Sequence, residues 1–199
     1  KIYSGPKLLE QILVQELQKS IRDFIQGMWI SHFFFIRYAD PDYHIRLRFR
    51  LTEGRHLGPI INNLSQALSH LVTDRSIYKV SYDTYNREME RYGNVIEIAE
   101  EIFHSDSHST MRYLLRTGLS DEYRWLYSMT WIDALLDSFQ FSDENKSKFY
   151  QNMCNVYHSE FGIQKQARVV MDKKYRKLSQ KIEMMFYTED HFGEYRLIM

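Results

Sequence analysis

A stretch of alternating charged and apolar residues, R-Y-A-D-P-D-Y-H-I-R-L-R-F-R at positions 37–50, constrains the fold of this chain more than any other feature. Its last part alternates three arginines with three apolar residues: Arg46, Arg48 and Arg50 with Ile45, Leu47 and Phe49. A period of two is the spacing of a β-strand, whose successive side chains point to opposite faces. The stretch therefore predicts a strand with one apolar face and one face of arginines, which repel one another unless an anion lies among them.

The segments around this strand predict a β-α-β-β-α-β order for the first half of the chain. Two stretches, residues 8–25 and 57–72, carry apolar side chains at helical spacing. Turn residues at positions 39–42 join two stretches of strand composition into a hairpin. The order is typical of a split-βαβ, ferredoxin-like fold, in which helices cover one face of the sheet and leave the other, here the arginine face, open. The expected strands are residues 1–4, 29–38, 44–51 and 77–82.

The second half of the chain is expected to be helical. The predicted class is α+β: a ferredoxin-like split βαββαβ subdomain at residues 1–90, which carries the arginine strand, and a helical subdomain at residues 91–199. The boundary is expected near residues 85–95, and the two parts are expected to form one integrated domain. Asp121 and Asp143 are the predicted N-caps of two of the helices. Helical spacing predicts helices at residues 95–104, 107–118, 121–139, 143–160 and 165–187.

Composition excludes several classes of protein. Lys+Arg and Asp+Glu both number 26, whereas a nucleic-acid-binding domain is usually basic, so the arginine strip is a local feature. The single cysteine, Cys154, rules out an internal disulfide and a cysteine-based zinc site, and favours a reducing, cytoplasmic location. No histidine spacing typical of a metal site and no glycine-rich phosphate loop occurs, so neither metal nor cofactor is expected. No stretch approaches the roughly 18 apolar residues that a membrane span requires.

The arginines need an anion, because a guanidinium group stays charged and grips carboxylates or phosphates in a planar fork. That anion is either a ligand or the carboxylates of the protein itself. A second charged stretch, N-R-E-M-E-R-Y-G at positions 86–93, places Glu88 and Arg91 three residues apart, on one face of a helical turn. A surface ion pair explains that spacing equally well. The candidate partners for the arginines within the chain are Asp40, Asp42, Glu88 and Glu90.

Three motifs resemble the C-terminal elimination domain of lantibiotic dehydratases, which also occurs alone in thiopeptide-type bacteriocin biosynthesis proteins. They are F-F-I-R-Y-A-D-P-D-Y-H-I-R-L-R-F at positions 34–49, Y-N-R-E-M-E-R-Y-G at 85–93 and A-E-E-I-F-H-S-D-S at 99–107. The opening K-I-Y-S-G-P is similar to the first strand and turn of that domain. The opening is neither a signal peptide nor a usual start, so we expect either the middle of a longer chain or a chain whose first residues are missing. Beyond about residue 110 only the helical character matches.

The resemblance implies an enzyme without cofactor that acts on a ribosomally made precursor peptide. Another domain or subunit glutamylates Ser or Thr, and the elimination domain removes the glutamate and leaves dehydroalanine or dehydrobutyrine. A homodimer is one option for its assembly. The resemblance makes Arg46, Arg48, Glu88 and Arg91 the catalytic candidates, and we add Arg37, His44, Arg50 and Tyr92 as candidate substrate-binding residues.

Several alternatives stay open at this point. The family carries a late helix with an H-M-x-x-N-R signature for proton transfer, whereas the last 60 residues here hold only His158 and His191, in other contexts. His44 or Tyr92 is the candidate to replace that histidine. A related activity is the formal aza-cycloaddition that closes a pyridine ring in thiopeptides, and a non-catalytic peptide-binding component is a further option. An open sheet with arginines and aromatics also suits single-stranded RNA, against which stand the neutral charge and the lack of a K-G-F-G-F run.

Overall fold

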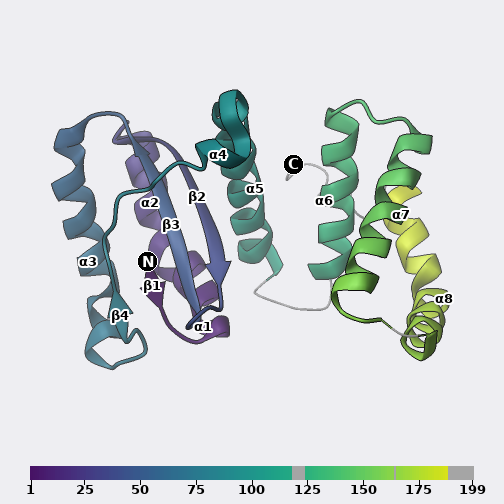
Figure 1. Cartoon of the computed structure of the whole chain (residues 1–199). Helices are drawn as coiled ribbons and strands as arrows, with labels where there is room; N and C mark the ends of the chain where they lie inside the picture. The colour runs from purple at the N-terminus through teal and green to yellow at the C-terminus, as the bar shows by residue number, and fades with distance from the viewer. Residues whose placement is uncertain (118–123, 164, 188–199) are drawn as a thin grey trace. The chain divides into compact units, whose positions relative to one another are not determined.

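The structure is a computed structural model that describes residues 1–117, 124–163 and 165–187 (Figure 1). The chain forms two compact units, Lys1–Leu119 and Ser120–Met199. The first unit holds the sheet together with the helices that cover it, and the second is helical. The α+β class that the sequence predicts is therefore confirmed: a four-stranded antiparallel sheet with helices, followed by a mostly helical part.

The sheet of the first unit has the strand order β2-β3-β1-β4, with every neighbouring pair antiparallel. The long hairpin strands β2 (Ile30–Tyr38) and β3 (His44–Leu51) match the predicted bounds to within one residue. The outer strands β1 (Ile2–Tyr3) and β4 (Lys79–Val80) are shorter than expected. Because β3 separates β1 from β2 and β1 separates β3 from β4, each β-α-β unit is split by one strand.

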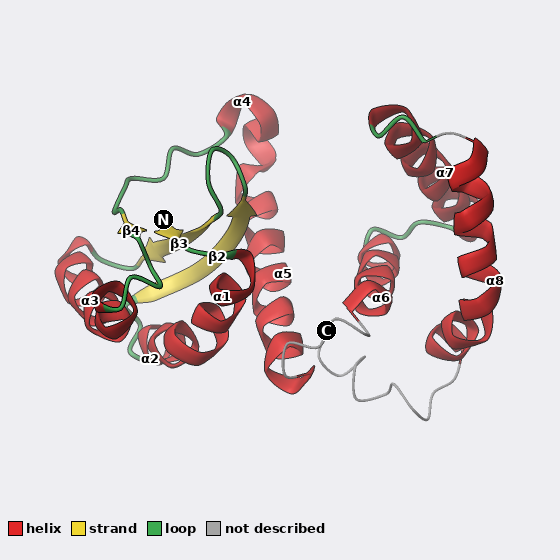
Figure 2. Ribbon diagram, turned by 90° about the horizontal axis from the view of Figure 1, so that it is seen from below, coloured by secondary structure: helices red, strands yellow, loops and turns green. Residues whose placement is uncertain are grey.

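One face of this sheet packs against helices, and the core lies between them. The stretch predicted as one helix is continuous, but it divides into α1 (Pro6–Gln11), a π-helical turn η1 (Ile12–Leu17) and α2 (Gln18–Gln26). The second helix is α3 (Leu57–Thr73), preceded by the 3-10 turn η2 (Gly54–His56). Figure 2 shows α1, α2 and α3 on one side of the sheet. The side chain of Ile45 is 1% exposed in this core, which fixes the apolar face of β3.

The outer edge of β2 is covered by α5 (Ile96–Thr117) instead of by another strand. Nδ1 of His104 lies 2.9 Å from the carbonyl oxygen and 3.3 Å from the backbone nitrogen of Phe33, and the backbone N–H of Phe35 donates to Oγ of Ser107 at 3.1 Å. Two helices were predicted here, at residues 95–104 and 107–118, and the predicted break between them is wrong because α5 is continuous. The serine-rich stretch stays helical because Ser107, 2% exposed, satisfies a strand donor that a turn would leave unpaired.

The open face of the sheet is crossed by residues 81–88, which form neither helix nor strand. This crossing segment leaves β4 and leads into the short helix α4 (Met89–Tyr92) and the 3-10 turn η3 (Gly93–Val95). Figure 2 shows it on the side of the sheet opposite α1, α2 and α3. Gly93 has a φ of 51°, a conformation that suits glycine, and it ends α4 after Tyr92. The change from mixed to helical structure falls in this region, but α5 packs with the sheet and belongs to the first unit.

The second unit contains three helices in its described part. They are α6 (Arg124–Ser138), α7 (Asp143–Glu160) and α8 (Lys165–Tyr187), and the last two have the predicted bounds. The N-cap of α7 is Ser142, whose side chain accepts from the N–H of Asn145, so the predicted cap at Asp143 is one residue late. The predicted cap at Asp121 and the histidine at position 191 lie outside the described residues. No helix in the described ranges is long and apolar enough to cross a membrane.

Candidate functional site

The alternating arginines of β3 share one face of the strand, as their spacing predicts. In the register of the hairpin, Arg46 is opposite Ile36 and Arg48 is opposite Phe34, and residues paired across a sheet share a face. Arg37 is opposite Ile45, which points into the core, so Arg37 lies on the helix face. The structure therefore separates Arg37 from the other three arginines of the stretch.

Two of the four arginines already have a carboxylate partner. Arg37 makes an ion pair with Glu10 of α1, whose side chain is 10% exposed. Arg50 donates from Nη1 to Oε2 of Glu97 on α5 at 3.0 Å. These two candidate substrate-binding residues are thus neutralised by helices that flank the sheet, which sequence spacing did not reveal.

Arg46 and Arg48 differ, because in the described part of the chain neither makes an ion pair with a carboxylate. The guanidinium carbon of Arg46 lies 3.7 Å from the centre of the Tyr38 ring. That of Arg48 lies 4.1 Å from the centre of Tyr85 and 5.3 Å from that of Phe34. Aromatic faces attract a guanidinium group without neutralising its charge. The two neighbouring arginines therefore keep their positive charge available to an anion.

His44 is buried beside Arg46 and uses both of its ring nitrogens. Nδ1 lies 2.8 Å from the carbonyl oxygen of Asp42, and Nε2 accepts from Nε of Arg46 at 3.0 Å. A carbonyl only accepts and a guanidinium only donates, so these partners select the Nδ1–H tautomer. The imidazole ring stacks between the rings of Tyr3 and Tyr38, with 4.7 Å and 5.3 Å between the ring centres. In this arrangement His44 orients Arg46, and its lone pair is free for a proton only if Arg46 moves.

Glu88 and Arg91 form the pair that their spacing predicts, with 3.7 Å between Oε2 and Nη1. Arg91 is the more exposed partner, with 73% of its side chain accessible, and its guanidinium lies 5.2 Å from the centre of the Tyr92 ring. Tyr92 in turn packs edge-to-face on Phe103 of α5 at 5.7 Å. Glu88, the N-cap of α4, thus pairs with an arginine of that helix and lies near Arg46 and Arg48.

Sequence reasoning missed two residues of the crossing segment, Tyr85 and Arg87. Arg87 donates two hydrogen bonds of 2.9 Å to the carboxylate of Glu100 and contacts Glu97 at 2.8 Å. The hydrogen bond from Arg87 lowers the pKa of the Glu97 carboxyl. Burial raises the pKa of Tyr85, and the nearby Glu100 carboxylate raises it further. Arg87 and Glu100 are 13 residues apart on different elements, so no periodicity relates them.

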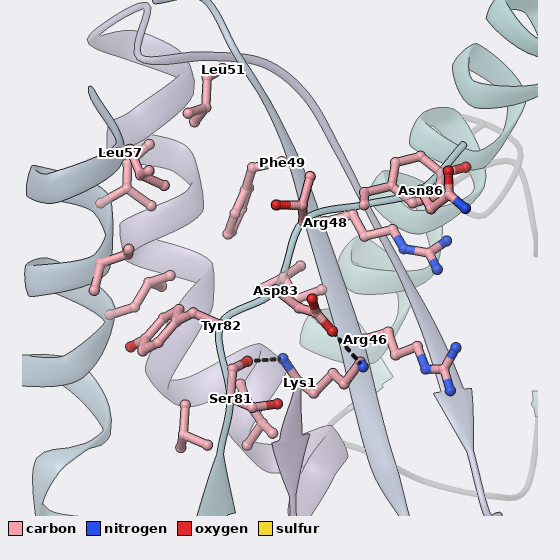
Figure 3. A pocket seen from close by; sticks show the side chains of 18 of the residues that line it. Lys1, Arg46, Arg48, Phe49, Leu51, Leu57, Ser81, Tyr82, Asp83 and Asn86 are labelled. Carbon is pink, nitrogen blue, oxygen red and sulfur yellow. Dashed lines mark hydrogen bonds and ion pairs between the residues drawn. The ribbon is translucent and has the colours of Figure 1, made fainter. Parts of the chain in front are cut away.

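These residues border a cleft of about 930 Å³ in the first unit. Its apolar wall comes from β3 and α3, with Phe49, Leu51 and Leu57 among its residues. Arg46 and Arg48 line it from β3, and the crossing segment forms a further side. Figure 3 shows Arg46 and Arg48 extending to one side of β3 and Phe49 to the other. The crossing segment is itself attached, because Lys1 Nζ donates to Asp83 at 2.8 Å and the hydroxyls of Tyr82 and Ser65 lie 2.8 Å apart.

Of the eight predicted site residues, three line the cleft: Arg46, Arg48 and Glu88. Arg91, Tyr92 and His44 are contacts of those residues, whereas Arg37 and Arg50 are bound to helix carboxylates. No group of three metal-ligating side chains occurs among the residues that the structure describes. The arrangement can bind an anion of one or two carboxylates at the junction of a charged and an apolar surface.

Residues 1–196 match the model of the family described as lantibiotic biosynthesis dehydratase, C-terminal, and the chain belongs to this family. Subtilin biosynthesis protein SpaB of Bacillus subtilis is 26% identical over 167 residues, which are 81% of this chain and 16% of that protein. Nisin biosynthesis protein NisB of Lactococcus lactis subsp. lactis is 33% identical over 79 residues, 39% of this chain and 8% of the relative. The chain therefore spans less than a fifth of the length of these relatives.

Two crystal structures have a similar fold. The tRNA-dependent lantibiotic dehydratase MibB from Microbispora sp. 107891 superposes with a TM-score of 0.53 and 25% identity, over 63% of this chain and 12% of that one. TsrL superposes with a TM-score of 0.66 and 14% identity, over 100% of this chain and 61% of that one. At 14% identity the likeness to TsrL concerns the fold alone.

Proposed function

We propose that this domain removes glutamate by β-elimination from glutamylated Ser or Thr residues of a ribosomally made precursor peptide. The observation that carries the proposal is the pair of neighbouring arginines, Arg46 and Arg48, which line a cleft without a carboxylate partner in the described chain. Membership of the dehydratase family and the likeness to SpaB and MibB support it. The strand order also supports a ferredoxin-like assignment for the first unit.

In this reaction a base takes the Cα proton of the glutamylated residue, and the electron pair forms the Cα=Cβ double bond. The Cβ–O bond breaks, and glutamate leaves as a free carboxylate. Negative charge develops on the ester oxygens as that bond breaks, so fixed cations next to them lower the barrier. The product is dehydroalanine from Ser or dehydrobutyrine from Thr.

Arg46 and Arg48 are suited to the leaving group because they stand two residues apart on one strand, about 7 Å between their Cα atoms. One guanidinium group can hold the free carboxylate of the glutamyl group and the other the ester oxygens that become a carboxylate. We assign Glu88 the role of orienting Arg91, which is its ion-pair partner. For proton transfer we favour Tyr92, since the lone pair of His44 is occupied by Arg46.

The partners in this proposal are the precursor peptide and a glutamylating dehydratase domain or subunit, and the reaction takes place in the cytoplasm. The chain covers 12% of MibB, whose description as tRNA-dependent refers to the whole dehydratase. We assign glutamylation to a separate domain or subunit, so that the cleft receives a peptide that is already glutamylated.

The test is mass spectrometry of a glutamylated precursor peptide incubated with the domain. We expect the loss of one glutamic acid for each modified site, and accumulation of the glutamylated peptide with Arg46→Ala or Arg48→Ala. Arg55→Ala is the matched control, because Arg55 is exposed and pairs with Glu53 at the surface. Normal turnover by both cleft variants would contradict the assignment. A peptide that binds with unchanged mass would indicate a non-catalytic component, and a pyridine ring in the product would indicate cycloaddition.

A further inference from the structure

Arg48 lies between two aromatic rings that are held in different ways. Phe34 is 6% exposed and directly opposite Arg48 in the hairpin, so the sheet fixes its position. Tyr85 approaches from the crossing segment, where no ladder of backbone hydrogen bonds holds it. The two rings meet edge-to-face with their centres 5.6 Å apart, so the guanidinium group of Arg48 contacts both.

The crossing segment is attached to Glu100 of α5 close to Tyr85. The side chain of Glu100 is 13% exposed and receives two hydrogen bonds from Arg87. The same carboxylate lies close enough to Tyr85 to raise the pKa of its hydroxyl, after the larger effect of burial. Arg87 therefore attaches the crossing segment to α5 two residues after Tyr85, while the ring face of Tyr85 lies against Arg48.

We propose that Tyr85 is a positioning residue, which holds the guanidinium group of Arg48 ready for the leaving carboxylate; this rests on the elimination proposed above. A flexible arginine loses rotamer freedom when it is ordered, so an arginine that is ordered beforehand binds its anion with a smaller loss of entropy. An aromatic face orders it without competing for the anion. Arg50 shows the contrast, because Glu97 orders that arginine and also neutralises it.

The kinetic test compares Tyr85→Leu with Tyr85→Phe on the glutamylated peptide. Loss of a cation–π contact corresponds to a decrease in rate of about fivefold to thirtyfold. We therefore expect Tyr85→Leu to lower kcat by this factor and to change KM by less than about threefold. Tyr85→Phe keeps the ring and should retain most of the activity. Tyr78→Leu is the control, since Tyr78 is exposed and contacts Tyr3. Equal losses for Tyr85→Leu and Tyr85→Phe would overturn the role of the ring.

A double-mutant cycle separates positioning from a general structural effect. In an Arg48→Ala background, Tyr85→Leu should lower kcat by less than about twofold, because the group that Tyr85 positions is gone. A tyrosine that only stabilises the fold would give the same factor in both backgrounds, and that result would overturn the proposal. If Tyr85→Leu does not fold, Tyr85→Met, with an unbranched side chain, replaces it in the cycle.

A measurement without substrate distinguishes failure of this inference from failure of the proposed function. The NMR order parameter of the Arg48 Nε–H bond should fall in Tyr85→Leu and stay unchanged in Tyr78→Leu, whether or not the wild-type domain eliminates glutamate. The Nε–H bond of Arg55 provides an internal reference for an exposed arginine. An unchanged order parameter for Arg48 in Tyr85→Leu would refute the positioning role by itself.

Discussion

Replacing Ser107 by Ala tests how α5 protects the edge of the sheet. The hydroxyl of Ser107 accepts the N–H of Phe35 at 3.1 Å, and the serine is 2% exposed. Removing the acceptor leaves a strand donor with neither water nor another partner, which costs about 1–3 kcal/mol. Alanine in turn favours the helix by roughly 0.5 kcal/mol. The expected net loss is therefore about 1–2 kcal/mol in the unfolding free energy of the first unit.

The matched control is Ser105→Ala, two residues earlier on the same helix and exposed. Ser105→Ala brings the same gain in helix propensity but removes no buried hydrogen bond. The free energy of unfolding should therefore be unchanged or slightly higher. Urea unfolding gives the free energies, and hydrogen exchange gives the protection of the Phe35 amide. We expect faster exchange at Phe35 in Ser107→Ala only. Equal unfolding free energies for the two variants, with Phe35 still protected, would refute the idea that Ser107 caps the edge.

Two further changes test the local conformations of the chain. Gly93→Ala places a Cβ at a φ of 51°, so we expect a loss of about 1–3 kcal/mol by thermal unfolding, while Gly58→Ala in α3 should be neutral or stabilising. Lys146→Met leaves two aspartates of α6 without the cation that contacts them at 3.0 and 2.7 Å, and should lower the melting temperature of the second unit. Lys148→Met, which removes only a surface pair with Glu144, should change stability by less than about 1 kcal/mol; an equal effect of the two lysines would contradict the bridge.

The elements that sequence patterns predicted well are those whose signals are local. β3, α7 and α8 have the predicted bounds, because alternation, caps and turn residues act over a few positions. The predicted break within α5 failed for a non-local reason. Ser107 belongs to a stretch of turn-like composition, but its hydroxyl binds a strand donor 72 positions earlier in the chain. That hydrogen bond stabilises the helix at a position where the local sequence alone favours a turn.

Some residues of the candidate site were likewise predicted from the sequence, and others were found only in the structure. The period of two was sufficient to place Arg46, Arg48 and Arg50 on one face, and the resemblance added Glu88 and Arg91. Neither signal could identify Tyr85, because its contact with Arg48 depends on where the crossing segment passes over the sheet. Arg87 was missed likewise, since its partners Glu97 and Glu100 lie on a helix whose packing no spacing reveals.

Side-chain alternation is a property of the extended backbone alone, so the order of residues was enough to predict a strand with one charged and one apolar face. Which arginines keep a free charge depends instead on how the helices pack on the sheet. Arg37 and Arg50 meet glutamates of α1 and α5, whereas Arg46 and Arg48 meet aromatic rings. The physical reason is that charge neutralisation depends on distances between elements, which arise when helices pack on the sheet, while strand periodicity is set within one element.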